Sequence, residues 1–390
     1  MKICDLTQFY SPASGGVRRY IGEKVHFMRE HAADDEQVLI IPGEHDECAG
    51  DARARVYTIG SPLISRTSRY RVLLRLEAVE RVLEREQPDL IESGDPYQVA
   101  WKAVHSGAAF GIPVIGFYHS HFPEAYLRSA QKYLGRTLTE FALDFSERYI
   151  RSLYNRFERT IVPSPALGEL LGRWGVRNVF ETDLGVDPSV FHPEATPGED
   201  VRAELNIPRD RTLLLYVGRL AQEKNTQTLF RAFRRLARHR AERFHLLVVG
   251  DGMQRGALEE LSLETRCVSW LPRAESPQLA QLYRAADLFV HPGVQETFGL
   301  VTLEAQACGT PVIGIHGSYM DRIIQNDQAL WARENSPRAL AAAIAATADA
   351  RLKSDPLALH RRVAAQYSWE QIFRRLFDLY REVIATYRRP

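Results

Sequence analysis

Two glutamates that stand eight residues apart are the densest sign of chemistry in the sequence. Glu296 follows the apolar run 288–292, which predicts a buried strand, so this acid falls in the loop where the strand ends. Glu304 would lie about two turns into a helix that begins near Phe298, where its carboxylate could accept hydrogen bonds from ligand hydroxyls. The alternative is structural: one acid favours the helix dipole and the other is solvated.

The backbone between these glutamates is suited to a phosphate. If the helix begins at Phe298, the N–H groups near Phe298, Gly299 and Leu300 have no partner within the helix. Unpaired N–H groups at the positive end of a helix dipole bind anions. Gly299 also lacks a Cβ, so a ligand can approach the main chain closely at that position.

A second group of residues follows the predicted strand 212–218 and ends in two cations. Arg219 can bind phosphate oxygens through two parallel hydrogen bonds, whereas Lys224 acts as a point charge. A strand, Gly218 and two cations ahead of a helix form a candidate clamp for a pyrophosphate. A solvated loop with an ordinary Glu223–Lys224 neighbour pair is the alternative.

Two further candidates lie in the first half of the chain. Gly15 and Gly16 precede a predicted helix and would let a ligand approach the backbone, although a simple strand-to-helix turn explains them equally well. They are not part of a G-x-G-x-x-G fingerprint. His119 ends the predicted strand 112–119 and could bind a polar substrate or transfer a proton, unless local structure satisfies it. We expect no metal at His119 and His121, because no nearby Cys, Asp or Glu completes a ligand set.

Composition bounds the class of protein. The chain has 390 residues, which suggests two domains, and its 50 Lys and Arg against 49 Asp and Glu leave a net charge of +1. Balanced charge argues against nucleic acid as a partner. Four scattered cysteines, a polar start and the lack of a long apolar run predict a cytoplasmic protein without a disulfide framework.

Short apolar runs alternate with amphipathic stretches along the whole chain. The predicted strands are 37–42, 90–94, 112–119, 160–164, 212–218, 244–250, 267–271, 288–292 and 311–314. This pattern is typical of parallel sheets covered by helices on both faces. The Pro-rich segment 188–211 reads as a connection between two doubly wound α/β domains, and one large α/β domain is the alternative. Ligands of such sheets bind beyond the carboxyl ends of the strands.

Basic and aromatic residues are interleaved between Tyr126 and Arg159. This stretch could present a basic amphipathic face to an anionic membrane surface. Acids such as Glu140, Asp144 and Glu147 interrupt it, so a solvated helix face explains it as well.

The sequence resembles glycosyltransferase family 4, the retaining glycosyl transferases group 1 with the GT-B fold. The similarity rests on Glu296 and Glu304 within QETFGLVTLEAQACGTPVIG, on Gly218, Arg219 and Leu220 with Glu223, Lys224 and Asn225, on 248–252 (VVGDG), on Ala286, Asp287 and Leu288, on 184–193 (LGVDPSVFHP), on 367–380 (YSWEQIFRRLFDLY), on Gly15 and Gly16, and on Tyr118, His119 and Ser120. It departs at Pro272 and at Ser318, where family members often have glycine.

The resemblance implies a division of the chain. Residues 1–187 would form a Rossmann-like acceptor domain on which the terminal helix 371–390 packs, and residues 188–370 would form the nucleotide-sugar donor domain, the two facing each other across a cleft.

The resemblance also implies roles for the site residues. For the donor sugar, Glu296 would contact its hydroxyls, and His119 would lie near the reacting centre. For the diphosphate, Gly218, Arg219 and Lys224 would bind it, Gly15 and Gly16 would approach it, and the backbone of Phe298, Gly299 and Leu300 would contact both sugar and phosphate. For the nucleoside, Glu304 would bind the ribose, and Trp270 and Leu271 would line the base pocket. The catalytic set would be Glu296, His119, Arg219 and Lys224.

A family member would be a metal-independent hexosyltransferase without a cofactor. It would move a hexosyl group from a nucleoside-diphosphate sugar, with a UDP-sugar favoured over GDP-mannose, to a hydroxyl of a lipid, a lipid-linked glycan or a polysaccharide intermediate. Its location would be cytoplasmic, with peripheral contact to the inner face of the membrane as the variant that the basic stretch suggests. A nucleotide-sugar epimerase or phosphorylase of the same fold, and a catalytically silent nucleotide-sugar-binding subunit, are the alternatives.

Overall fold

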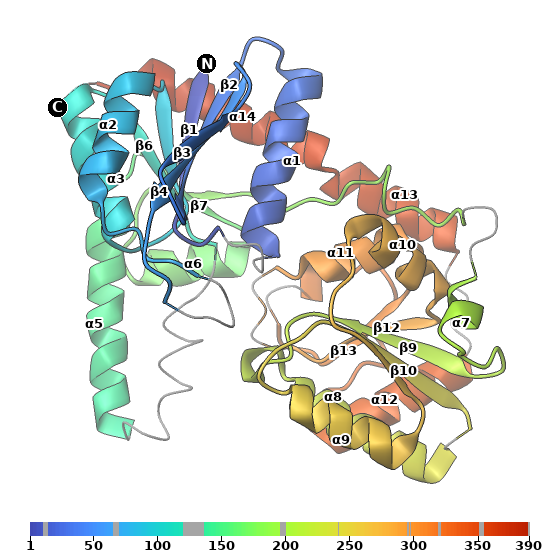
Figure 1. Cartoon of the computed structure of the whole chain (residues 1–390). Coiled ribbons are helices and arrows are strands. Elements are labelled where there is room, and N and C mark those ends of the chain that lie inside the picture. Colours follow the sequence, from blue (N-terminus) through green and yellow to red (C-terminus); the bar gives the residue numbers. More distant parts are fainter. Residues whose placement is uncertain are drawn as a thin grey trace. The chain divides into compact units, whose positions relative to one another are not determined.

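The computed structural model of the chain (Figure 1) describes residues 1–10, 15–64, 70–119, 136–195, 200–240, 242–294, 296, 298–318, 321–350 and 355–388. It divides into two compact units, Met1–Leu184 with Trp369–Pro390 and Gly185–Ser368. The boundaries expected from the sequence, after residues 187 and 370, lie three and two residues beyond these. The roles of the units as acceptor and donor domains remain predictions.

Unit 1, the first of these, is built on an eight-stranded sheet in the order β3-β4-β2-β1-β5-β6-β7-β8 within the described residues. Its strands are β1 (Lys2–Leu6), β2 (Glu36–Gly43), β3 (Glu47–Gly50), β4 (Ala54–Gly60), β5 (Leu90–Ser93), β6 (Val114–Phe117), β7 (Thr160–Val162) and β8 (Val179–Glu181). Neighbouring strands are parallel except β3, which pairs antiparallel with β4 at the edge.

Helices pack on both faces of this sheet (Figure 1). They are α1 (Gly16–His31), α2 (Leu76–Glu86), α3 (Gln98–Phe110), α5 (Arg136–Tyr154), α6 (Pro165–Arg173) and α14 (Trp369–Thr386). The C-terminal α14 packs against α1, where Phe27 meets Phe373 and Phe377 at ring-centroid distances of 5.7 and 5.0 Å. Packing of the terminal helix on the first unit was expected from the resemblance, and the aromatic contacts give its physical basis.

A buried charge cluster fixes α1 and α14 to the sheet of unit 1. Lys24 on α1 is fully buried and lies 2.6 Å from Asp5 and 3.0 Å from Glu92. The hydroxyls of Tyr20 and Tyr380 both donate to Glu92. One cation between two carboxylates is stable in the interior because these hydroxyls satisfy Glu92 and the Gln37 side-chain amide donates to the second oxygen of Asp5.

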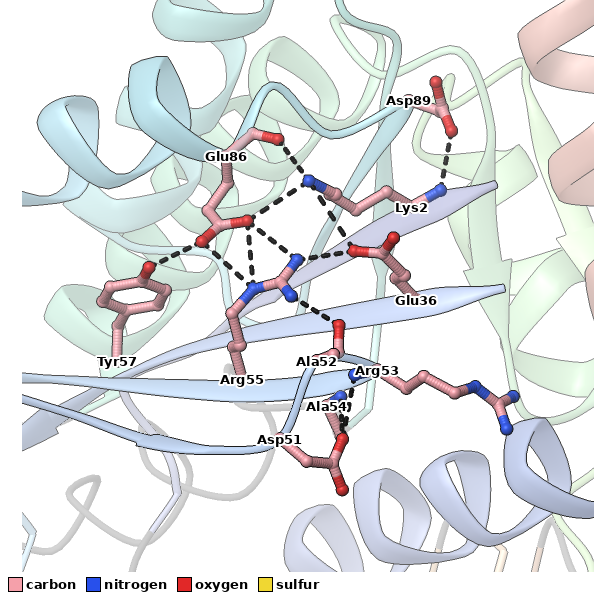
Figure 2. A network of polar contacts seen from close by, with 10 residues as sticks. All are labelled: Lys2, Glu36, Asp51, Ala52, Arg53, Ala54, Arg55, Tyr57, Glu86 and Asp89. Carbon is pink, nitrogen blue, oxygen red and sulfur yellow. Dashed lines mark hydrogen bonds and ion pairs between the residues drawn. The ribbon is translucent and has the colours of Figure 1, made fainter. Parts of the chain in front are cut away.

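A second polar network lies at the amino ends of the strands of unit 1 (Figure 2). Glu86 at the end of α2 accepts hydrogen bonds from Tyr57 at 2.6 Å, from Arg55 at 3.2 Å and from Lys2 at 3.3 Å. Arg55 also reaches Glu36 at 2.6 Å. These contacts join α2 to β1, β2 and β4, far along the strands from the edge at which parallel sheets bind ligands.

Unit 2 holds a five-stranded parallel sheet in the order β11-β10-β9-β12-β13. Its strands are β9 (Thr212–Val217), β10 (Phe244–Val249), β11 (Val268–Leu271), β12 (Leu288–His291) and β13 (Val312–Gly314), and its helices are α7 (Val201–Glu204), η1 (Gln222–Lys224), α8 (Thr226–Arg240), α9 (Arg255–Thr265), α10 (Ser276–Ala285), α11 (Leu300–Ala307), η2 (Asp321–Ile323), α12 (Pro337–Ala350) and α13 (Pro356–Tyr367). In Figure 1, α8, α9 and α12 cover one face, and α10 and α11 cover the other.

Each strand predicted from an apolar run overlaps an observed strand, and most of the predicted runs extend one or two residues beyond it at one or both ends. The prediction of two doubly wound sheets is therefore confirmed. In the described part of the chain, no helix is long and apolar enough to cross a membrane.

Candidate active site

The strand order of unit 2 creates a switch point between β9 and β12. The chain runs from β9 to β10 and β11 on one side and then returns to β12 on the other side of β9. The loops that leave the two central strands diverge there, which opens a place for a ligand at the carboxyl ends. The loop after β9 carries Gly218 to Lys224, and the loop after β12 carries Glu296.

The structure brings Lys224 and Glu296 together across this switch point. The Lys224 ammonium donates a hydrogen bond to Glu296 Oε2, although the two residues are 72 positions apart in the sequence. Burial alone would raise the pKa of Glu296, but the charge and hydrogen bond of Lys224, together with the charges of His291 and Arg219, hold this pKa below the ordinary value. The site therefore contains an ionised carboxylate beside an ammonium group.

Asn225 explains how the two loops are held in register. Its side-chain amide donates to the Pro292 carbonyl at 2.7 Å, and its oxygen accepts from the Thr228 hydroxyl at 2.7 Å. Its φ of 56° is left-handed, a conformation that asparagine tolerates better than most residues. Sequence reasoning included Asn225 in the family motif but gave it no place in the site.

Three glycines let the loops after β9 and β10 touch through their backbones. A Cβ at Gly250 would lie 2.0 Å from the Gly218 carbonyl oxygen, and one at Gly252 would lie 2.5 Å from that of Leu220. The φ angles of Gly218 and Gly250, 154° and 134°, also exclude ordinary side chains. Gly218 therefore shapes the loop that carries the cations.

Arg219 lies on the surface of this loop. Its side chain is 59% exposed and pairs with Glu223 at 3.2 Å, while the Tyr216 hydroxyl donates to its carbonyl at 3.0 Å. The neighbour pair of Glu223 with Lys224, given above as part of the alternative to a phosphate clamp, is not the pairing observed. Glu223 pairs with Arg219, and this leaves Lys224 to Glu296.

The helix after Glu296 begins two residues later than predicted. Phe298 is buried at 3% exposure, and Gly299 adopts a left-handed φ of 74° just before α11 begins at Leu300. The predicted helix start at Phe298 is therefore wrong, because Phe298 anchors the loop in the core and Gly299 reverses the chain. Gly299 accepts hydrogen bonds from the amide and the hydroxyl of Thr302 at 2.9 and 2.7 Å.

Glu304 occupies the buried face of α11. It is 2% exposed and accepts a hydrogen bond from the Tyr283 hydroxyl at 3.0 Å. The alternative in which this acid is solvated is thus excluded. Its role toward a ribose remains a prediction.

The residues expected to line a base pocket lie on β11, two strands from β9. The Trp270 indole donates to the Gly250 carbonyl at 2.8 Å, and the Arg255 guanidinium lies 4.4 Å from the ring centroid. Leu271 ends the same strand and is half-buried. Nothing in these contacts selects one base over another.

Unit 1 has its own switch point, between β1 and β5, and its candidates lie near it. Gly16 is the first residue of α1, and a Cβ at Gly15 or Gly16 would meet no atom within 4 Å. His119 follows β6 and packs on Phe117 with ring centroids 3.8 Å apart. Burial lowers the pKa of His119 to about 3, so the ring is neutral and suited to hydrogen bonding rather than to carrying a proton. Residues 120–135, with His121 and part of the basic stretch, lie outside the described residues.

Asp95 is a buried acid that sequence reasoning missed. It is 2% exposed, accepts from the Gln8 amide at 2.7 Å, and burial raises its pKa to about 6. It braces the loop after β1, and only its position after the apolar run 90–94 hinted at it. In the described ranges, no group of three or more His, Cys, Asp or Glu is placed to hold a metal ion.

Buried histidines predict acid sensitivity. Burial lowers the pKa of His245 and of His291 to about 4, against 6.5 in a model peptide. Between pH 4 and 6.5 these histidines are therefore protonated in the unfolded chain and neutral in the folded chain. The stabilisation is complete above pH 6.5 and is lost as the pH falls toward 4, at about 1.4 kcal/mol per pH unit for each histidine.

His245 tests this without touching the site. We expect the unfolding free energy of His245→Asn to fall less steeply between pH 6.5 and 4 than that of the wild type, by about 1.4 kcal/mol per pH unit. Urea titrations at several pH values measure it. His26, with a 57% exposed side chain, is the control, and His26→Asn should keep the wild-type slope. Equal slopes for all three proteins would contradict the prediction.

Comparison with known proteins identifies the family. Models of glycosyl transferases group 1 and of Glycosyltransferase Family 4 match residues 198–359 and 14–190. The chain is 30% identical over 308 residues to a D-inositol 3-phosphate glycosyltransferase of Thermobispora bispora, covering 74% of this chain and 68% of that one. It is 29% identical over 381 residues to a GDP-mannose-dependent alpha-(1-6)-phosphatidylinositol dimannoside mannosyltransferase of Mycobacterium tuberculosis, covering 95% and 93%.

A solved structure supports the fold. Sucrose-phosphate synthase from Thermosynechococcus elongatus superposes with a TM-score of 0.78 at 23% identity, covering 98% of this chain and 99% of that one. Two parallel α/β units with a cation and an acid at the switch point of the second agree with what the sequence comparisons show. The chain belongs to glycosyltransferase family 4 and is a nucleotide-sugar-dependent glycosyltransferase of the GT-B fold.

Proposed function

We propose that the protein is a retaining hexosyltransferase, which moves a hexosyl group from a nucleoside-diphosphate sugar to an acceptor hydroxyl. The observation that carries this proposal is the Lys224–Glu296 pair at the switch point of unit 2. An acid held ionised by an ammonium can accept hydrogen bonds from sugar hydroxyls. The same ammonium would stabilise the charge of a diphosphate bound to the N–H groups near Gly299.

The chemical difficulty of the reaction is the charge that develops on the leaving diphosphate. Positioned cations and backbone N–H groups stabilise such charge without reorganising during the reaction. Lys224 and Arg219 supply cations, and the start of α11 supplies N–H groups. The acceptor would attack the face that the diphosphate leaves, and the leaving phosphate would take the acceptor proton, which retains the anomeric configuration.

The relatives bear on the donor. The sequence alone favoured a UDP-sugar, whereas the names of the mannosyltransferase relatives specify GDP-mannose. We therefore place GDP-mannose first and a UDP-hexose second. The relative named for phosphatidylinositol dimannoside supports a lipid acceptor, whereas the relative named for D-inositol 3-phosphate supports a soluble inositol phosphate.

The test is transfer from a panel of nucleotide sugars. We expect release of GDP or UDP that depends on an acceptor, and a glycosylated product with the donor's anomeric configuration by NMR. Turnover without acceptor would favour an epimerase. Absorbance from a lysine-bound pyridoxal phosphate would favour a phosphorylase, and nucleotide binding without turnover a silent subunit.

Substitutions of the two glutamates should have different effects on nucleotide affinity and on kcat. Glu304→Ala should weaken the binding of free GDP or UDP by roughly 10- to 100-fold, since a charged hydrogen-bond partner contributes about 1.5–3 kcal/mol. Glu296→Ala should mainly lower kcat. Equal losses of nucleotide affinity in both variants would contradict the roles proposed for them. Variants of Gly16 and His119 test the roles predicted for unit 1 in the same way.

The reaction should not need a metal. The proposed cations replace it, and the sequence holds no two aspartates at a D-x-D spacing. We expect kcat/KM in EDTA to stay within about twofold of the untreated value. Complete loss in EDTA that magnesium or manganese restores would contradict a metal-independent route.

The described part of the basic stretch, residues 136–159, supports contact with an anionic membrane surface. Leu138, Phe141 and Phe145 project from one side of α5 and are 53%, 68% and 64% exposed. At the end of α5, a surface cavity of about 700 Å³ is lined by Arg148, Arg151, Arg156 and Arg177 together with neutral residues. An apolar stripe beside arginines fits an interface that carries phosphate groups.

Vesicle binding tests the membrane contact. Phe141→Ser with Phe145→Ser should lower cosedimentation with vesicles rich in phosphatidylglycerol by at least about fivefold, because burial of two aromatic side chains is lost. Leu263→Ser is the control, since Leu263 is 82% exposed on α9 of the other unit. Equal cosedimentation of the wild type and both variants would exclude α5 as the contact.

A further inference from the structure

His291 is a buried polar residue beside the candidate site to which neither the family motif nor the comparisons give a role. It is the last residue of β12, and only 6% of it is exposed. Its Nε2 has no hydrogen-bond partner within the described residues. A buried polar atom of this kind costs free energy unless something pairs with it, so it needs a functional or structural explanation.

Geometry places this nitrogen close to Glu296. A Cβ built on Gly293 would lie 3.0 Å from His291 Nε2 and 3.9 Å from Glu296 Cβ. Nε2 and Glu296 therefore flank the same point on the loop after β12. The charges of Glu296, Lys224 and Asp321 all act on the ring. His291 thus belongs to the surroundings of the Lys224–Glu296 pair.

The hydrogen-bonding state of the ring follows from its surroundings. Burial keeps the imidazole neutral near pH 7, so one nitrogen carries a proton and the other a lone pair. In the tautomer that carries its proton on Nδ1, Nε2 offers a lone pair.

A lone pair selects the chemistry of its partner. An ionised phosphate has only acceptors and cannot donate to Nε2, whereas a sugar hydroxyl can. We propose that His291 Nε2 accepts a hydrogen bond from a hydroxyl of the transferred sugar, next to the hydroxyl bound by Glu296, and so contributes to the choice of sugar. This proposal rests on the function proposed above.

Such an acceptor rejects sugars that lack the hydroxyl. A deoxy sugar would leave Nε2 buried and unpaired, and a site built to bind a hydroxyl discriminates strongly against the analogue without it. His291 would therefore act on the transferred sugar and leave the affinity for the free nucleotide unchanged. This separates it from a residue that only stabilises the loop.

Two substitutions separate the two ring nitrogens. The amide of His291→Asn can place a nitrogen near Nδ1 but has no atom at Nε2, whereas His291→Gln can place an oxygen near Nε2. With the preferred donor we expect kcat/KM of His291→Asn to fall roughly 10- to 100-fold and His291→Gln to recover part of the loss. The Kd of free GDP or UDP should stay within about twofold of the wild-type value in both.

Deoxy donors make the test specific. The donors are nucleotide sugars that each lack one hydroxyl of the transferred sugar. We expect one of them to have a lower kcat/KM than the parent donor with the wild type, and this difference to disappear in His291→Asn, as in a double-mutant cycle. His245→Asn is the matched control, because His245 is equally buried in the same unit and one of its ring nitrogens also has no partner among the described residues, but it lies on β10. It should keep the wild-type pattern with every donor.

The outcomes distinguish the two proposals. If the wild type transfers no sugar from any donor, the proposed function fails. If it transfers sugar but His291→Asn keeps the same penalty for every deoxy donor, or loses free-nucleotide affinity in parallel, only the role of His291 fails. Should His291→Asn not fold, Gly293→Ala replaces it. Its methyl group would enter the space beside Nε2, so kcat/KM should fall with nucleotide affinity intact, and unchanged kcat/KM would overturn the proposal.

Discussion

Replacing Lys224 by methionine is expected to lower kcat/KM by roughly 10²- to 10³-fold, the range seen when one preorganised electrostatic group is removed from a site. Two losses combine in this variant. The leaving diphosphate loses a cation, and Glu296 loses the charge that holds its pKa down despite burial. Arg219→Met should cost less, because Arg219 is 59% exposed and already paired with Glu223.

The double variant shows whether the two cations act on one group. If both stabilise the same diphosphate, the loss in Arg219→Met/Lys224→Met should be smaller than the sum of the single losses in free energy. Steady-state kinetics of the three variants and their melting curves provide the measurement. Arg273 is a matched control, since it is also 59% exposed and pairs with a nearby acid, Glu275, at 2.7 Å. If each single variant keeps its kcat/KM within about threefold of the wild-type value, Arg219 and Lys224 belong to a solvated loop and do not act on the diphosphate.

Gly250→Ala is expected to lower the stability of unit 2 by about 3 kcal/mol or more. A Cβ at this position would lie 2.0 Å from the Gly218 carbonyl oxygen, and the backbone φ of 134° is strained for any other residue. The loop after β9 would have to move, and the cations with it. Activity should therefore fall together with stability.

Urea unfolding and melting curves measure this loss, with an expected Tm lower by roughly 5–10 °C for a domain of this size. Gly256→Ala is the control. Gly256 lies in α9, and a Cβ there would meet no atom within 4 Å, so this variant should match or slightly exceed the wild type in stability. If Gly250→Ala were as stable as Gly256→Ala, the close approach of the two loops would be contradicted.

All five described strands of unit 2 and four of the eight described strands of unit 1 could be predicted from the sequence, because parallel strands are buried on both faces. The run Thr212–Val217 is apolar over nearly its whole length, and the same holds for Phe244–Val249. The edge hairpin of β3 and β4 gave no such signal. All four residues of β3 are exposed, so burial imposes no apolar pattern on them.

The residue types of the site could be read from the sequence as well. Glycine, arginine and lysine after one strand and two glutamates after another are chemically suited to a diphosphate and a sugar, and the family motif ties them together. The start of α11 was misplaced because Phe298 fits the apolar face of a helix. Only the packing of Phe298 in the core and the left-handed φ of Gly299 moved the start to Leu300.

The sequence by itself thus determined the fold class, the family and the chemical character of the two loops. Tertiary structure alone decided which charges meet. Lys224 pairs with Glu296 rather than with the adjacent Glu223 because β9 and β12 are neighbours in the sheet and Asn225 holds their loops together. It also decided that Glu304 is buried and that His291 Nε2 stands unpartnered among the described residues. The physical reason is that these properties depend on contacts between residues distant in the chain, which local periodicity does not encode.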